Sequence, residues 1–262
     1  MSVKIVSGFS STGGSTLYFI TLTNLLNSHG IDCTFYGPHE WHLDKCRGGT
    51  LEECSLNDPE ERLIVHFLKL PRRPEVSKRV VLACHEKEVY TVKDVQPFWD
   101  NIVYVSNSQM FWQGVHGRVI PNVISKLIPS KDCGARVSAG VVGSIDRNKN
   151  TRESIIRALR DGSGTVKLYG AVTDEEYFEE EIKEFVDCGD AVMCGYVDNK
   201  QAMYDSLSKV YHSSLSETFN FIKVECQKTG TEYHGLDSSE SGAEVWDDDQ
   251  ILEAWEEELE LK

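Results

Sequence analysis

Two glutamates separated by seven residues are the first candidates for binding or catalytic chemistry. Glu217 and Glu225 belong to the run Ser214-Leu-Ser-Glu-Thr-Phe-Asn-Phe-Ile-Lys-Val-Glu-Cys-Gln-Lys-Thr-Gly230. The pattern predicts a loop and then a helix, with Glu225 about two turns into the helix. Carboxylates accept hydrogen bonds from sugar hydroxyls, and the free amides at a helix start suit a phosphate. Glutamate pairs are common on helices, so the spacing alone is unspecific.

A second candidate is the polar segment Val142-Gly-Ser-Ile-Asp-Arg-Asn-Lys-Asn150, between a predicted strand and a predicted helix. Arg147 and Lys149 would stand just beyond the carboxyl end of that strand, where ligands of open α/β sheets bind. Two cations there would neutralise a diphosphate. The alternative is a solvated loop with an asparagine N-cap.

Two further candidates lie in the first half of the chain. Gly13 and Gly14 occupy the turn before the first predicted helix, where glycine allows backbone amides to approach a phosphate. A tight turn that needs a positive φ explains them equally well. His85 ends the apolar run Val81-Leu-Ala-Cys84, at another predicted strand end. A buried structural histidine is the alternative there.

The elements that would position these residues alternate between strand and helix. The predicted strands are 3–6, 31–36, 62–67, 79–83 and 101–105, with 119–122 closing this half, and then 139–142, 165–169, 191–194 and 210–212. Predicted helices are 17–29, 150–160, 174–187, 199–207 and 219–228. Strand, helix and strand in succession indicate right-handed βαβ units and parallel sheets. The fold class is therefore α/β, with two doubly wound Rossmann-like domains and a cleft between them.

The predicted domain boundaries follow composition. Residues 1–123 form the first domain, 124–137 a linker without clear period, and 138–262 the second domain. Residues 237–262 carry a net charge of −10 of the chain's −15. Ile251, Trp255 and Leu259 there stand at helical spacing, which predicts an amphipathic terminal helix. We favour a helix docked on the core, with a solvated acidic face, over an acidic interaction tail.

Composition excludes several classes of protein. The chain of 262 residues is 40% hydrophobic and 26% charged, as in globular proteins, and it lacks an apolar run long enough to cross a bilayer. We expect a cytoplasmic protein with no stable membrane insertion, because no signal peptide is visible. Eight cysteines without a C-x-x-C pair indicate reduced thiols and no zinc site. The acidic balance argues against nucleic acid, although basic residues cluster at Lys69, Arg72, Arg73, Lys78 and Arg79.

Taken together, the segments resemble the family-four retaining glycosyltransferases of GT-B fold. That family carries a Glu-x7-Glu motif in a Ser-Glu-x-Phe-Gly-x-x-x-x-Glu-Ala run, which here reads Ser216-Glu-Thr-Phe-Asn-Phe-Ile-Lys-Val-Glu225. Gly13-Gly14 is similar to its N-terminal glycine loop, Cys84-His85-Glu86 to its strand-end histidine, and Val142-Gly143 with Lys149-Asn150 to its Val-Gly-Arg…Lys-Asn segment. The chain departs from the family at Ser144, where an arginine is usual, and at Asn220, where a glycine is usual.

The resemblance implies a mechanism. A nucleoside-diphosphate sugar would be the co-substrate, with no metal and no other cofactor, and the anomeric configuration would be retained. Glu217, Lys149 and His85 would be catalytic. The donor would be bound by the residues of the glycine loop, the cationic loop and the helix start, together with the second glutamate: Gly13, Gly14, Arg147, Asn220, Phe221 and Glu225.

The acceptor stays open between a small molecule or glycan and modified DNA. The compact chain resembles bacteriophage glycosyltransferases, some of which place glucose or arabinose on hydroxymethylated cytosine, and such a protein would act in the cytoplasm of the host cell. Two other functions stay open as well. A non-catalytic nucleotide-sugar-binding protein would fit Ser144 and Asn220, and a phosphorylase would need inorganic phosphate.

Overall fold

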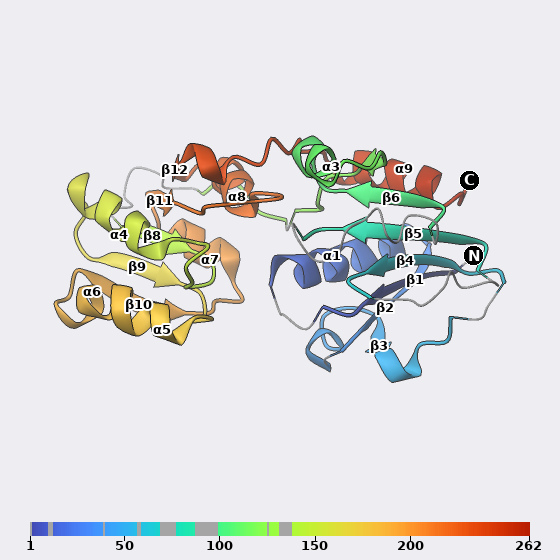
Figure 1. The fold of residues 1–262 in the computed structure, drawn as a ribbon, viewed down its shortest axis with the longest axis horizontal. Coiled ribbons are helices and arrows are strands. Elements are labelled where there is room, and N and C mark those ends of the chain that lie inside the picture. Colours follow the sequence, from blue (N-terminus) through green and yellow to red (C-terminus); the bar gives the residue numbers. More distant parts are fainter. Residues whose placement is uncertain are drawn as a thin grey trace. The chain divides into compact units, whose positions relative to one another are not determined.

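The protein is described here from a computed structural model, which covers residues 2–9, 13–38, 40–56, 59–68, 77–86, 99–124, 126–130 and 138–262. The chain divides into two compact units (Figure 1). The first unit joins Met1–Ile124 to Gly242–Lys262, and the second is Ser125–Ser241. Each unit is built on one parallel sheet, which confirms the predicted α/β class.

The first unit contains a seven-stranded parallel sheet of order β3-β2-β1-β4-β5-β6-β7. Ile5 of β1 is opposite Phe35 of β2 on one side and Ile64 of β4 on the other. Strands β4 and β5 are almost wholly buried, as expected for inner strands of a parallel sheet that is covered on both faces. The strands are β1 (Ser2–Ser7), β2 (Asp32–Gly37), β3 (Gly48–Thr50), β4 (Arg62–His66), β5 (Arg79–Cys84), β6 (Asn101–Tyr104) and β7 (Arg118–Val119).

Local sequence explains the helices of this unit. Helix α1 (Gly14–Ser28) ends before Gly30, whose φ of +78° stops the helix at low steric cost. Helix α9 (Asp248–Glu258) begins with a capping box between Asp247 and Gln250. Helix α3 (Asn107–Gln113) is capped by the Ser106 side chain, and two 3₁₀ turns are η1 (Glu40–His42) and η2 (Leu51–Glu53).

The second unit contains a five-stranded parallel sheet of order β10-β9-β8-β11-β12. Its strands are β8 (Ala139–Val142), β9 (Val166–Tyr169), β10 (Ala191–Gly195), β11 (Lys209–His212) and β12 (Glu232–Gly235). The helical elements are α4 (Thr151–Arg160), α5 (Glu175–Tyr177), the π-helix η4 (Phe178–Ile182), α6 (Lys183–Asp187), α7 (Lys200–Asp205), α8 (Phe221–Thr229) and the 3₁₀ turn η5 (Asp237–Ser239).

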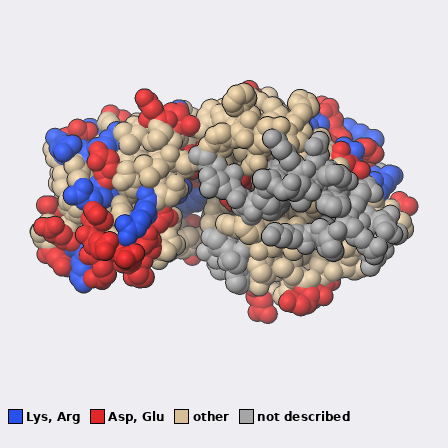
Figure 2. All heavy atoms as spheres, viewed as in Figure 1, with Lys and Arg blue, Asp and Glu red and all other residues tan. Residues whose placement is uncertain are grey.

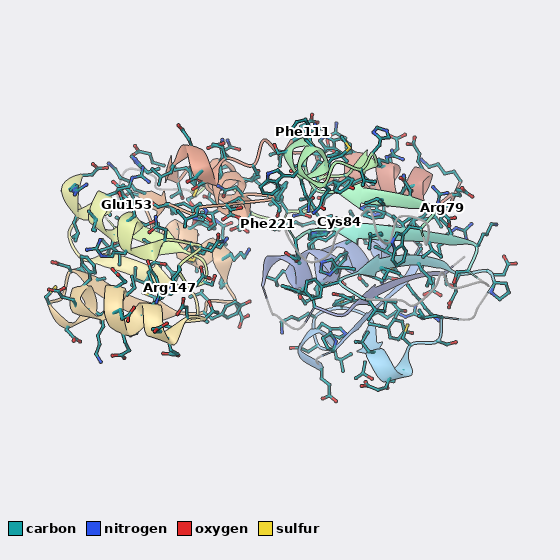
Figure 3. All side chains as sticks on the ribbon, in the orientation of Figure 1. Arg79, Cys84, Phe111, Arg147, Glu153 and Phe221 are labelled. Carbon is teal, nitrogen blue, oxygen red and sulfur yellow. The ribbon has the colours of Figure 1, made fainter. Side chains whose placement is uncertain are left out.

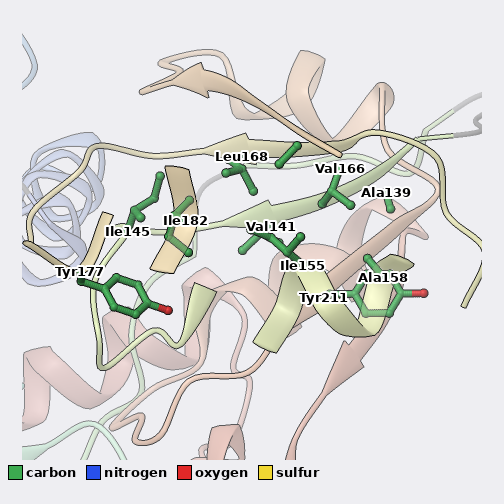
Figure 4. Close-up of a cluster of buried hydrophobic side chains, with 11 residues drawn as sticks. Ala139, Val141, Ile145, Ile155, Ala158, Val166, Leu168, Tyr177, Ile182 and Tyr211 are labelled. Atoms are coloured by element: carbon green, nitrogen blue, oxygen red, sulfur yellow. The ribbon is translucent and has the colours of Figure 1, made fainter. Parts of the chain in front are cut away.

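The core of the second unit packs helix α4 against the sheet. Ile155 and Ala158 are fully buried against Val141, Val166 and neighbouring side chains, as Figure 4 shows. The helix has one apolar and one charged face, which gives it its orientation on the sheet. At one edge of the sheet β12 pairs with β11, although the polar sequence of β12 is unusual for a strand.

The terminal helix is the main correction to the predicted organisation. We expected residues 138–262 to form one domain, but residues 242–262 belong to the first unit. Trp255 is fully buried and its Nε1 donates to the hydroxyl of Tyr18 in α1 at 3.0 Å. Arg62, 2% exposed, donates from Nε to the carbonyl of Leu259 at 2.6 Å. The apolar stripe of the helix therefore lies on the first sheet's own core, as a docked helix should.

The acidic face of α9 also meets basic residues of the first unit. Glu258, 4% exposed, accepts from Arg79 at 3.0 Å and from Asn101 Nδ2 at 2.9 Å. Arg118 pairs with Glu257 at 2.7 Å. Of the predicted basic cluster, Lys69, Arg72 and Arg73 lie outside the described residues. Within the described part of the chain, no helix has the length and apolar character needed to cross a bilayer.

Candidate functional site

The strongest candidate site lies at the carboxyl edge of the second sheet, between β8 and β11. Lys149 follows β8 and Glu217 follows β11, and Lys149 Nζ donates to Glu217 Oε1 at 2.6 Å. His212, the last residue of β11, makes a second bond of 2.9 Å from its Nε2 to the same oxygen. The structure therefore brings together two of the predicted catalytic residues and adds a histidine.

Backbone contacts hold the two loops together. The amide of Leu215 donates to the carbonyl of Asn148 at 2.8 Å, and Ser214 Oγ donates to that carbonyl at 3.3 Å. Within the first loop, Asp146 Oδ1 accepts the amide of Lys149 at 2.7 Å. Ser144, at the position where the resembling family has arginine, donates from Oγ to Asp146 Oδ2 at 2.5 Å. Ser144 therefore stabilises the loop that presents Lys149.

Glu217 is a charged carboxylate that is largely buried, with its side chain 10% exposed. Burial by itself would raise the pKa of Glu217. The hydrogen bond from His212 and the charge of Lys149 outweigh burial, so the pKa of Glu217 lies below its ordinary value of 4.5. Both described donors meet Oε1, so these two bonds leave Oε2 unused. An ionised carboxylate of fixed orientation is suited to bind a hydroxyl.

Glu225, the second glutamate of the motif, is buried on α8 with 2% exposure. Its Oε2 accepts the hydroxyl of Tyr204 at 2.7 Å, and its Oε1 pairs with Lys200. Both partners belong to α7, four positions apart on one face of that helix. Each glutamate of the pair thus has a lysine partner of its own. Lys200 is 30% exposed, so solvent reaches the outer end of the Glu225 pair.

Asn220 and Phe221 are used differently from the prediction. Asn220 caps α8 by accepting the amide of Lys223 at 2.9 Å, and its Nδ2 donates to Tyr233 at 2.7 Å and to the carbonyl of Ser239 at 2.9 Å. The side chain is 97% buried in these contacts, since the residue is 3% exposed. The amide of Phe221 donates to the carbonyl of Phe219 at 3.0 Å. The polar groups expected to bind phosphate are committed to helix capping and turn bonds instead.

Arg147 is not part of the Lys149 group. Its guanidinium pairs with Asp174 at 3.3 Å and Glu180 at 3.1 Å, and it stands over the ring of Tyr177. Figure 3 shows Arg147 beside α5, and Figure 2 shows acidic side chains gathered over the same region of the second unit. Its three carboxylate partners are thus Asp174, Glu176 and Glu180, whereas Glu217 is paired with Lys149.

The remaining predicted residues lie in the first unit. His85, 5% exposed, packs against Tyr18 and Phe19 with ring centroids 4.4 and 4.8 Å away. Burial, helped by nearby His66, lowers the pKa of His85 well below its ordinary value, so the ring is neutral. Gly13 is the N-cap of α1 with φ of −75°, so a positive φ does not explain glycine there, and Gly14 is exposed as the first helical residue.

Sequence reasoning missed three residues of the second unit: His212, Lys200 and Tyr204. His212 ends a predicted strand, as His85 follows one, so the same sequence signal could have identified His212. Lys200 and Tyr204 share one helix face, but nothing in the sequence links that face to Glu225. No group of three or more His, Cys, Asp or Glu residues suited to a metal gathers among the residues that the structure describes.

Comparison with known proteins gives the fold. No family model and no curated protein sequence matches the chain. Among solved structures, HepE of Anabaena in complex with UDP and glucose superposes with a TM-score of 0.73, at 12% identity over 99% of both chains. TarM gives 0.72, at 8% identity over 100% of this chain and 92% of that one. AviGT4, a glycosyltransferase of avilamycin A biosynthesis, gives 0.63 at 13% identity over 98% and 97%. The chain has the GT-B fold, with two Rossmann-like units.

Proposed function

We propose that this protein is a glycosyltransferase that takes a sugar from a nucleoside diphosphate and transfers it to a hydroxyl with retention of anomeric configuration. The observation that carries the proposal is the Lys149–Glu217 pair at the carboxyl ends of the neighbouring strands β8 and β11, where the strand order of the sheet reverses. Open α/β sheets bind ligands at such a switch point. The similar fold of HepE, described with UDP and glucose, supports a nucleotide-sugar donor.

Lys149 would stabilise the negative charge that develops on the leaving diphosphate. The bond between the sugar's anomeric carbon and the diphosphate oxygen breaks, and a bond from the same carbon to the acceptor oxygen forms. The hydroxyl proton leaves with the diphosphate or to solvent. Negative charge develops on the leaving diphosphate, and a fixed ammonium group stabilises it without reorganising. Lys149 is 25% exposed and held by Glu217, so it can reach a ligand at this edge.

The two glutamates would orient the donor. Glu217, with Oε1 held by two donors, would accept a hydroxyl of the sugar through Oε2. Glu225 would accept the ribose hydroxyls, and Lys200 would share or leave its carboxylate when the donor binds. No metal ion is included in the proposal, because Lys149 supplies the positive charge.

We propose a carbohydrate or small hydroxyl compound as acceptor rather than DNA. The chain's net charge is −15, and Arg79 of the predicted basic cluster is engaged by Glu258. Phosphate contacts by basic residues dominate DNA affinity. Binding of duplex DNA at low salt that weakens steeply as salt rises would contradict this choice of acceptor.

A non-catalytic nucleotide-sugar-binding protein is the second candidate. The commitment of Ser144 and Asn220 to internal hydrogen bonds favours it, because neither residue is then available to the diphosphate.

The test is a panel of UDP-, GDP- and ADP-sugars. Thermal stabilisation identifies a donor that the folded protein binds. Release of the nucleoside diphosphate is then measured with that donor, for the wild type and for Glu217→Gln. Release that depends on Glu217 supports the transferase, and binding without release supports the binding protein. Absence of stabilisation by every donor contradicts both.

A further inference from the structure

Each glutamate of the Glu217–Glu225 pair is neutralised by a lysine from a different element. Lys149, in the loop after β8, pairs with Glu217, and Lys200, the first residue of α7, pairs with Glu225. Glu217 lies in the loop before α8, and Glu225 lies about 6 Å along that helix, since it is four positions from the first helical residue. The two ammonium groups therefore lie near the first turn of α8.

Of the two contacts of the Glu225 carboxylate, the one with Lys200 can be exchanged. The other oxygen, Oε2, accepts the hydroxyl of Tyr204, a fully buried side chain, at 2.7 Å. Lys200 is 30% exposed, and its ammonium is carried on a flexible four-carbon stem. Among the described residues this ammonium has no partner besides Glu225. Tyr204 can therefore keep Glu225 in place while Lys200 moves to another anion.

A nucleoside diphosphate at this site would offer a new partner to both members of the pair. The ribose hydroxyls are neutral donors, so by binding Glu225 Oε1 they replace the ammonium there. The released ammonium of Lys200 is then stabilised by the nearest anion, because a partly buried charge gains from a partner of opposite sign. The diphosphate is that anion, since it is attached to the same ribose. One binding event thus transfers Lys200 from a carboxylate to a phosphate.

Two other cations of the second unit are placed differently. Arg147 is held by the acidic side chains around α5. Lys223, in the first turn of α8, is also paired with a carboxylate, and it is two positions from Glu225, which places it about 200° around the helix axis. A diphosphate carries more charge than Lys149 alone can offset. Lys200 is on the face of α8 where a second cation is needed.

We infer that Lys200 is a second phosphate-binding cation, which moves from Glu225 to the diphosphate when the nucleotide sugar binds. This inference rests on the proposed function, in which Glu225 holds the ribose. It gives α7 a part in that function, because Lys200 then acts together with Lys149 on the leaving diphosphate. In the free protein Lys200 covers Glu225, whose side chain is 3% exposed.

The test separates the affinity for phosphate from the affinity for the nucleoside. Dissociation constants are measured by calorimetry for UDP, GDP and ADP, and by saturation-transfer NMR for uridine, guanosine and adenosine. The ratio of the nucleoside constant to the diphosphate constant gives the phosphate contribution. We expect Lys200→Ala to lower this ratio about tenfold. Lys223→Ala removes a paired lysine from another face of the same helix start, and it should leave the ratio within about twofold of the wild type.

A second pair of variants avoids a buried carboxylate without its cation, which would destabilise Lys200→Ala. In Glu225→Gln the lysine has lost its carboxylate, so the nucleoside should bind more weakly while the ratio is kept or raised. Adding Lys200→Ala to Glu225→Gln should then lower the ratio by about tenfold. Circular dichroism and thermal melting check that each variant is folded.

The inference is overturned if replacing Lys200, in either background, changes the ratio no more than Lys223→Ala does. A wild type that binds no nucleoside diphosphate rejects the inference and the proposed function together. Release of nucleoside diphosphate from the donor sugar is measured on the same samples. A ratio that depends on Lys200 without any release keeps the phosphate contact and rejects the transferase. Release with a ratio that does not depend on Lys200 does the reverse.

Discussion

Lys149 and Glu217 are 68 positions apart in the chain, and their side chains meet at 2.6 Å. The topology of the second sheet explains this contact. After β8 the chain builds β9 and β10 to one side, and it returns to place β11 on the other side of β8. The loops that follow β8 and β11 therefore start from adjacent strand ends, and they contact each other there. Two residues distant in sequence become a charge pair because their strands are neighbours.

Removing the cation should slow turnover more than it weakens folding. We expect Lys149→Ala to lower kcat for nucleoside-diphosphate release by about 10²–10³, the loss typical of a missing charge-stabilising donor, equivalent to about 3–4 kcal/mol. Initial rates with the donor identified by thermal stabilisation measure this. Lys126→Ala, which removes an exposed lysine of the same unit, serves as the control. Equal rates for both variants would remove Lys149 from the mechanism.

His212 should act by positioning Glu217. We expect His212→Ala to reduce kcat/KM for the donor about tenfold, because Glu217 then keeps a single described donor on Oε1. His212→Gln offers an amide donor and should recover part of that loss. Steady-state kinetics of both variants, with unfolding curves beside them, give the answer. A purely packing role predicts that stability falls in both variants while kcat/KM of the folded protein stays unchanged.

The pH dependence of stability should reveal the ionised state of Glu217. Its pKa in the folded protein lies below the ordinary 4.5, so its ionised form stabilises the fold above pH 4.5. That contribution is lost as the pH falls below 4.5 and through the folded-state pKa. Urea unfolding of wild type and Glu217→Gln between pH 3.5 and 7 measures the difference. The gap in unfolding free energy should narrow toward acid, and a constant gap would contradict the assignment.

The terminal helix should stabilise the first unit. The side chain of Trp255 is fully buried and packs beside α1. We expect Trp255→Ala to lower the unfolding free energy by about 3–5 kcal/mol, because a large buried side chain leaves a cavity. Urea unfolding followed by circular dichroism measures it. Glu253→Ala, an exposed position on the same helix, should change stability by about 0.5 kcal/mol or less. Similar effects of the two substitutions would show a loosely attached helix.

Gly170 should resist substitution because backbone atoms touch it. A Cβ there would lie 1.8 Å from the carbonyl oxygen of Gly143, and its φ is +151°. Gly162, with φ of +78°, has nothing within 4 Å. We expect Gly162→Ala to cost about 1–2 kcal/mol through backbone conformation alone, and Gly170→Ala to cost about 3 kcal/mol or more. Urea unfolding compares the two, and equal costs would mean that the Gly143 loop moves freely.

Much of the fold follows from local sequence. The strand 139–142 and the helix at 151–160 lie within a residue of their predicted bounds, because an apolar run and an amphipathic period are local properties. Strand β3 and helix α3 were not predicted. Two of the three residues of β3 are glycines, and α3 is seven residues long, so neither carries a clear hydrophobic period.

The sequence by itself determined the alternation of strands and helices and the candidate Lys149 and Glu217, since these depend on periodicity and on residue types at strand ends. Only the tertiary structure decided which charges pair. It turned Arg147 to the carboxylates of α5 and η4, gave Glu225 the partners Lys200 and Tyr204, and returned α9 to the first unit. Those choices depend on packing between segments far apart in the chain, and the spacing of residues along a sequence does not encode them.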